Sequence, residues 1–121
     1  MKPAASLPKI LLLLEGATTL LASLVFYRAH DGSWGKFAAL FLVPDLAMIG
    51  YMGGLKLGAA CYNAAHTYFL PLGIGVLCYL AGQSSVVPLL AIWTAHIGFD
   101  RMIGLGLKYP TAFRHSHFNR M

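Results

Sequence analysis

Four long apolar stretches, separated by short polar or glycine-containing turns, set the pattern of the chain. Each is close to the roughly 20 residues that cross the hydrocarbon core of a bilayer, and the turns contain the residues that end helices. The sequence predicts helices over residues 10–27, 34–52, 56–80 and 86–107. We therefore expect an all-α polytopic membrane protein, a four-transmembrane-helix bundle that forms a single domain over 1–121, with a short C-terminal tail, 108–121.

The composition agrees with a membrane protein. Hydrophobic residues make up 58% of the chain and charged residues 11%, whereas soluble domains have roughly 45–50% and about 25%. The formal net charge is +5, but the basic residues gather at the ends of the apolar stretches and form no patch with interleaved aromatic residues. The sequence therefore argues against a nucleic-acid partner and predicts a multi-pass protein of the cell's inner (plasma) membrane, with the lipid bilayer as its partner.

The basic residues also predict an orientation. With four spans, both termini and the loop between the second and third helices lie on one side of the membrane. That side holds Lys2, Lys9, Lys56, Lys108, Arg114 and Arg120, and the opposite side holds only Arg28 and Lys36. The excess of positive charge places both termini in the cytoplasm.

Each predicted helix carries polar or ionisable residues within its apolar span. Counted from the cytoplasmic ends at 1.5 Å per residue, these groups lie roughly 8–16 Å deep, in one slab of the membrane. They are Glu15, Asp45, Asn63, His66, His96 and Asp100. A charged side chain at this depth costs about 2.5–3.5 kcal/mol, so the carboxylates need a proton, a partner or a cation. We expect the group to face a shared polar pocket.

Spacing along the helices supports such a pocket. His96 and Asp100 are four residues apart, and Tyr62 and His66 are also four apart, so each pair shares one helix face. Pro44 and Pro71 each leave the carbonyl four residues earlier without its helical partner. Such defects are common where backbone lines a cavity within a membrane.

The leading hypothesis is an intramembrane enzyme that acts on a small hydrophobic or lipid-like substrate by acid/base or metal-assisted chemistry. The predicted catalytic groups are His96, Asp100, Asp45 and Glu15. The predicted orienting and substrate-binding groups are Asn63, His66, Tyr62 and Arg101.

Three alternatives remain open at this stage. One is a divalent-metal site formed by His66, His96, Asp100 and Asp45, because helical bundles bind metals through carboxylates and histidines on facing helices; the usual Glu-x-x-His motif is absent. The second is a proton-coupled small-molecule transporter. The third is a structural network in which the polar groups only hold the helices together. The sequence assigns no substrate and no oligomeric state.

Several segments resemble a small bacterial membrane-protein family, domain of unknown function 4260. They are Leu42-Val43-Pro44-Asp45-Leu46, Tyr62-Asn63-Ala64-Ala65-His66-Thr67-Tyr68, Ala95-His96-Ile97-Gly98-Phe99-Asp100-Arg101 and Gly106-Leu107-Lys108-Tyr109-Pro110-Thr111-Ala112-Phe113. Leu105 departs from the aromatic residue expected in the family at that position. The resemblance covers nearly the whole chain and implies a four-helix integral membrane protein, without an established activity.

Overall fold

The described part of the chain is helical throughout. The computed structural model describes residues 7–105 and 107, and within them no strand occurs. The elements are α1 (Leu7–Ala29), α2 (Trp34–Leu40), the 3-10 helix η1 (Val43–Gly53), α3 (Leu55–Ala65), α4 (Phe69–Leu80), the short 3-10 helix η2 (Ser84–Val86) and α5 (Val87–Met102). The predicted all-α class is confirmed.

Two of the four predicted helices are divided, and this corrects the sequence prediction. The stretch 34–52 becomes α2 and η1, and the stretch 56–80 becomes α3 and α4. Pro44 and Pro71 lie in the first turns of η1 and α4. Because a proline lacks an N–H and its ring crowds the preceding turn, each proline starts a new helix instead of kinking a continuous one.

The last helix ends five residues earlier than the predicted residue 107. Gly104 adopts a left-handed φ of 91°, and its N–H donates to the carbonyl of Arg101 (3.1 Å), while the N–H of Leu105 donates to the carbonyl of Asp100 (2.7 Å). This pair of hydrogen bonds is the Schellman motif, which closes a helix after glycine takes the left-handed position. The predicted tail, 108–121, lies outside the described residues.

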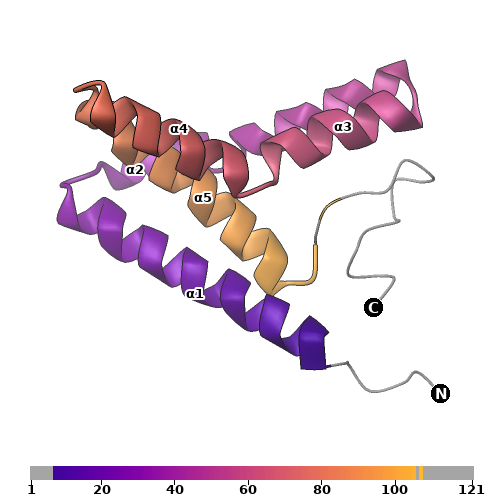
Figure 1. Ribbon diagram of the computed structural model, residues 1–121, viewed down its shortest axis with the longest axis horizontal. Helices are drawn as coiled ribbons and strands as arrows, with labels where there is room; N and C mark the ends of the chain where they lie inside the picture. Colours follow the sequence, from indigo (N-terminus) through magenta and orange to yellow (C-terminus); the bar gives the residue numbers. More distant parts are fainter. Residues whose placement is uncertain (1–6, 106, 108–121) are drawn as a thin grey trace.

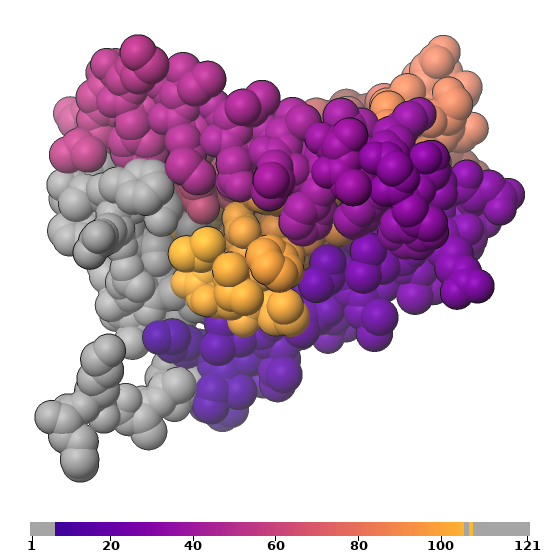
Figure 2. All heavy atoms as spheres, turned by 180° about the vertical axis from the view of Figure 1, so that it is seen from behind, coloured from indigo at the N-terminus to yellow at the C-terminus, as the bar shows by residue number. Residues whose placement is uncertain are grey.

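α5 is the central element. α1 packs along one side of it and α4 covers another, while η1 and α3 form a helical hairpin that projects away from these three helices (Figure 1). The hairpin turns at Gly54, whose φ is 111°. Seen from behind, α5 and the residues just after it surface in one patch between α1 and η1 (Figure 2).

Glycines allow α1 and α5 to approach closely. A Cβ at Gly98 would lie 2.7 Å from the amide nitrogen of Leu20 and 2.8 Å from the carbonyl oxygen of Gly16, and a Cβ at Gly16 would lie 2.5 Å from the Cβ of Arg101. Small residues at helix crossings are typical of helices that pack without a hydrophobic driving force in lipid. The position of α5 against α1 thus depends on the absence of side chains at these two residues.

Several polar side chains are buried beside apolar ones such as Ile92 and Ile97, and many large apolar side chains are exposed. Ser23, His66, Thr94, His96 and Asp100 are buried, whereas large apolar side chains on α1, η1, α3 and α4 are exposed. By length and composition, two stretches are apolar enough to span a membrane, Leu7–Ala29 and Trp34–Gly53. The predicted four-span topology stays a prediction, and the termini that would report their cytoplasmic side lie outside the described residues.

Candidate metal centre

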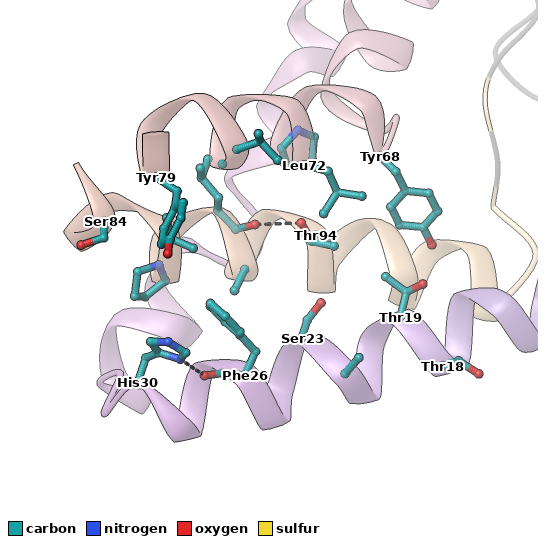
Figure 3. Close-up of a pocket in the computed structure, with 18 of the residues that line it drawn as sticks. Thr18, Thr19, Ser23, Phe26, His30, Tyr68, Leu72, Tyr79, Ser84 and Thr94 are labelled. Carbon is teal, nitrogen blue, oxygen red and sulfur yellow. Dashed lines mark hydrogen bonds between the residues drawn. The ribbon is translucent and has the colours of Figure 1, made fainter. Parts of the chain in front are cut away.

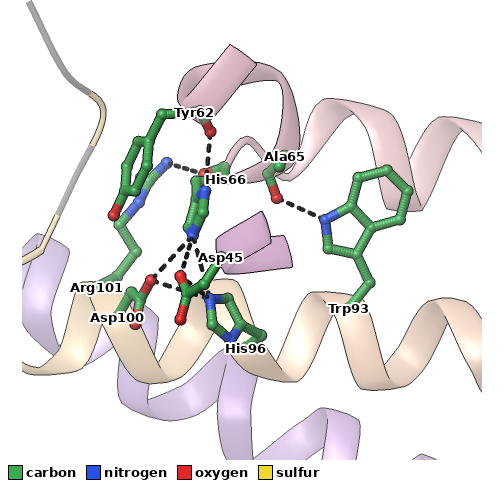
Figure 4. A network of polar contacts seen from close by, with 8 residues as sticks. All are labelled: Asp45, Tyr62, Ala65, His66, Trp93, His96, Asp100 and Arg101. Atoms are coloured by element: carbon green, nitrogen blue, oxygen red, sulfur yellow. Dashed lines mark hydrogen bonds and ion pairs between the residues drawn. The ribbon is translucent and has the colours of Figure 1, made fainter. Parts of the chain in front are cut away.

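Four polar side chains from three separate elements converge on one point. Asp45 comes from the first turn of η1, His66 follows the last residue of α3, and His96 and Asp100 lie one turn apart on α5 (Figure 4). One ligand atom from each of the four residues lies within 4.8 Å of the others. All four were predicted as site residues from the sequence.

The distances that involve the two histidine nitrogens of this cluster are short and nearly equal. The Nε2 atom of His66 lies 3.1 Å from Asp45 Oδ1 and 3.3 Å from Asp100 Oδ2, and the Nε2 atom of His96 lies 3.1 Å and 3.2 Å from the same two oxygens. The two Nε2 atoms are 3.1 Å apart. In a tetrahedral metal site with bonds of about 2.0 Å, neighbouring ligand atoms are about 3.3 Å apart. Five of the six distances between these four atoms are therefore close to the edge length of a tetrahedral site, and the sixth, between the two carboxylate oxygens, is at most 4.8 Å.

Hydrogen bonds alone fit these contacts poorly. His66 Nδ1 lies 2.8 Å from the carbonyl oxygen of Tyr62; since a carbonyl only accepts, Nδ1 carries the proton, and in neutral His66 the Nε2 atom offers a lone pair. Even if both histidines were doubly protonated, each Nε2–H could point at one neighbour only. The two Nε2 atoms make four short contacts with the carboxylate oxygens and one with each other. A cation at the centre would bind all four of these atoms and so account for all five contacts.

Burial makes a net charge on the cluster energetically unfavourable. His66, His96 and Asp100 are buried, with relative exposures of 2%, 1% and 7%. The side chain of Asp45 is 34% exposed and forms the open side of the cluster. Two carboxylates with neutral histidines carry a charge of −2, which a divalent cation would neutralise. Buried charges are normally paired or bound to a metal.

The position of His66 is fixed by residues on α3 and α5. The Tyr62 ring stacks on its imidazole, with ring centres 3.8 Å apart and planes at 6°. Trp93 Nε1 donates to the carbonyl of Ala65 (2.6 Å), and the Arg101 guanidinium donates to the carbonyl of His66 (3.1 Å) (Figure 4). The end of α3 would otherwise leave these carbonyls unpaired, so the same bonds that cap α3 hold the imidazole in place.

Trp93 was not singled out from the sequence. The spacing could have indicated it, because Trp93, His96 and Asp100 are three and four residues apart and so share one face of α5. Tyr62 and Arg101 were predicted to bind substrate, and the structure places both in contact with His66. Asn63 is half-buried on α3, and its backbone carbonyl accepts a hydrogen bond from the backbone N–H of His66 at 3.2 Å.

Glu15 lies away from the cluster, unlike the prediction that grouped it with Asp45 as an acid/base partner. Its side chain is exposed, and His66 pairs with Asp45 and Asp100 instead. The reason is helix geometry: Gly16 faces α5 across the close contact described above, and the preceding residue points about 100° away.

Two cavities adjoin these elements. A small one of about 420 Å³ is lined by apolar side chains that include Pro44, Ala65 and Trp93, which neighbour the cluster residues in sequence or on the same helix face. A larger cleft of about 1410 Å³ runs between α1, α4 and the start of α5, with Glu15 in its lining. The four cluster residues line neither cavity.

Comparison with protein families identifies the chain. A family model described as "Domain of unknown function (DUF4260)" matches residues 9–121. The chain belongs to this family. The DUF4260 match includes all four cluster residues and both of their supporting side chains on α5, while the family segment Gly106–Phe113 falls outside the described residues apart from Leu107. Searches of curated proteins and of solved structures gave no match to this DUF4260 chain.

Proposed function

We propose that this DUF4260 protein is an integral membrane metalloprotein that binds one divalent transition-metal ion and uses it on a small hydrophobic substrate. The observation that carries the proposal is the convergence of Asp45, His66, His96 and Asp100, with both histidine nitrogens 3.1–3.3 Å from each carboxylate and from each other. The metal would join η1, α3 and α5.

The membrane assignment is supported by the many large apolar side chains that are exposed. Phe69, Leu77 and Leu80 on α4 are 78%, 68% and 74% exposed, and Met52 on η1 is 90% exposed. Soluble monomers rarely expose apolar surfaces of this extent. In lipid these side chains are solvated, and the buried polar groups are shielded from it.

Zn²⁺ is the ion that best fits the ligands. Two imidazole nitrogens and two carboxylate oxygens form a mixed set of the kind that zinc accepts, and four ligand atoms at these spacings favour four-coordination. The Nδ1–H of His66 also donates a hydrogen bond to the backbone carbonyl of Tyr62, which is the usual arrangement of a metal-bound histidine.

The chain's own residues supply the features of a reaction site. Asp45 is the most exposed of the four side chains, so it is the ligand that a water or substrate oxygen would displace. The small apolar cavity beside Pro44, Ala65 and Trp93 offers space for a small hydrophobic group. A divalent ion held here would polarise a substrate oxygen or activate a water molecule.

Metal analysis of the purified protein tests the proposal. The detergent-solubilised chain is stripped with a chelator, reloaded with Zn²⁺ and measured by mass spectrometry and thermal unfolding. We expect about one ion per chain and stabilisation of about 2.7 kcal/mol at a free zinc concentration of 100 times Kd. Asp100→Asn removes a buried ligand and should weaken zinc binding at least about 100-fold, and Asp45→Asn should weaken it less.

Asp31→Asn is the matched control, because Asp31 is an exposed carboxylate in the turn after α1 and should leave zinc binding unchanged. A purely structural network predicts that wild type, Asp100→Asn and the control respond alike to zinc and to chelator between pH 5 and 8. That result would refute the metal centre. Recovery of the protein in the soluble fraction after alkaline extraction of membranes would refute the membrane assignment.

A further inference from the structure

The larger cleft is a second candidate site, on a different side of α5 from the cluster. It lies between α1 and α4, with the first half of α5 as its floor (Figure 3). Most of its lining is apolar or aromatic, and polar residues from α1, from α5 and from the start of α4 also line it. Glu15, Thr18, Thr19, Ser23, Tyr68 and Thr94 belong to this lining.

The threonine O–H groups in the cleft already donate hydrogen bonds to backbone carbonyls of their own helices. Thr18 donates to the carbonyl of Leu14 (2.8 Å), Thr19 to that of Glu15 (2.8 Å), and Thr94 to that of Leu90 (2.9 Å). Each hydroxyl therefore offers only lone pairs to a ligand. These positions favour a ligand that donates hydrogen bonds.

The charge of the cleft lining also favours a ligand that donates hydrogen bonds, in particular a cationic one. Glu15 is an acidic residue in the lining, one turn before Thr19 on α1. Thr19 lies at the end of the cleft that holds Tyr68 (Figure 3). Among the described residues, the lining contains no Lys or Arg. His30 lies at the opposite end, and its Nδ1 is 2.9 Å from the carbonyl of Phe26, so that nitrogen is also engaged (Figure 3).

We propose that this cleft binds a lipophilic amine, a single apolar chain or ring system that carries one ammonium group and no phosphate. The ammonium would lie at Glu15 and the threonine hydroxyls, and the apolar part would lie along Leu72 and Val76 of α4. A phospholipid fits less well, because its phosphate would find no cationic side chain. The inference goes beyond the proposed metal function, since no residue of the cluster lines the cleft.

Binding of dodecylamine to the protein in phosphatidylcholine nanodiscs tests this inference, with empty nanodiscs as the background. We expect saturable binding of dodecylamine, and weaker binding of dodecanol and of dodecyl phosphate. Glu15→Gln should weaken the binding of dodecylamine at least about tenfold, which corresponds to about 1.4 kcal/mol. Asp31→Asn again serves as the control, because that carboxylate lies outside the cleft lining.

A second variant tests the location. Gly75 lines the cleft, and a Cβ there would be in ordinary contact, 3.5 Å from Leu90 Cδ1, so Gly75→Leu should fold and obstruct the cleft for dodecylamine and dodecanol alike. Asp100→Asn should bind dodecylamine as wild type does, which separates this inference from the metal centre. Equal binding of dodecylamine by wild type and Glu15→Gln, a preference for dodecyl phosphate, or displacement of dodecylamine by equimolar phosphatidylethanolamine would overturn the inference.

Discussion

The contact between α1 and α5 gives the sharpest prediction about stability. In Gly98→Ala the new Cβ would meet backbone atoms, 2.7 Å from the nitrogen of Leu20 and 2.8 Å from the oxygen of Gly16. Backbone atoms cannot rotate away, so the helices must separate by roughly 0.6–0.7 Å to restore contact at about 3.4 Å. Overpacking of this kind costs about 1–3 kcal/mol, and we expect the free energy of unfolding to fall by that amount.

Gly73→Ala is the matched control. Gly73 lies within α4, and a Cβ built there has no neighbour within 4 Å, so alanine should stabilise the helix by up to about 0.5–1 kcal/mol. Both variants are unfolded by denaturant in the same detergent, with helicity measured by circular dichroism. If Gly98→Ala is as stable as Gly73→Ala, the close approach of α1 and α5 is wrong.

Three further predictions concern the cluster and its supports. Trp93→Phe removes the indole donor to the carbonyl of Ala65 and should lower the free energy of unfolding by about 1–3 kcal/mol, whereas Trp34→Phe, at a side chain that is 49% exposed, should have little effect in the same assay. Tyr62→Leu removes the ring stacked on His66 and should weaken zinc binding about 10–100-fold in competition with a chelator, the usual range for residues that support a metal ligand. Acidification from pH 8 to pH 5 should release zinc, because histidines bind metals only when deprotonated; retention of the ion at pH 5 would contradict ligation by His66 and His96.

Spacing in the sequence predicted the site residues on α5 and α3 better than it predicted the helices that carry them. His96 and Asp100 lie on one face of α5, as their separation of four residues requires, and Tyr62 lies against His66 for the same reason. Apolar length, however, predicted one helix over 56–80. The proline defect at Pro71 was visible in the sequence, but the side chains that satisfy the end of α3 come from α5 and are known only once the chain has folded.

Depth along a helix was an incomplete guide to the site. Glu15 was grouped with the other acids because its distance from the membrane surface is similar, but depth does not specify direction around the helix axis. That direction is set by Gly16, whose close contact with α5 turns the carboxylate toward the cleft. The cleft itself could not be predicted, because it is formed by three helices whose relative positions no local pattern specifies.

The order of the cluster residues along the chain has a consequence for biosynthesis. Asp45 and His66 are made before α5, which supplies His96 and Asp100. A chain that lacks α5 has half of the proposed ligand set, one side chain from η1 and one from the end of α3. Zinc uptake would therefore report that the last helix has been made and has docked, and a nascent chain released before residue 87 would stay in the metal-free state.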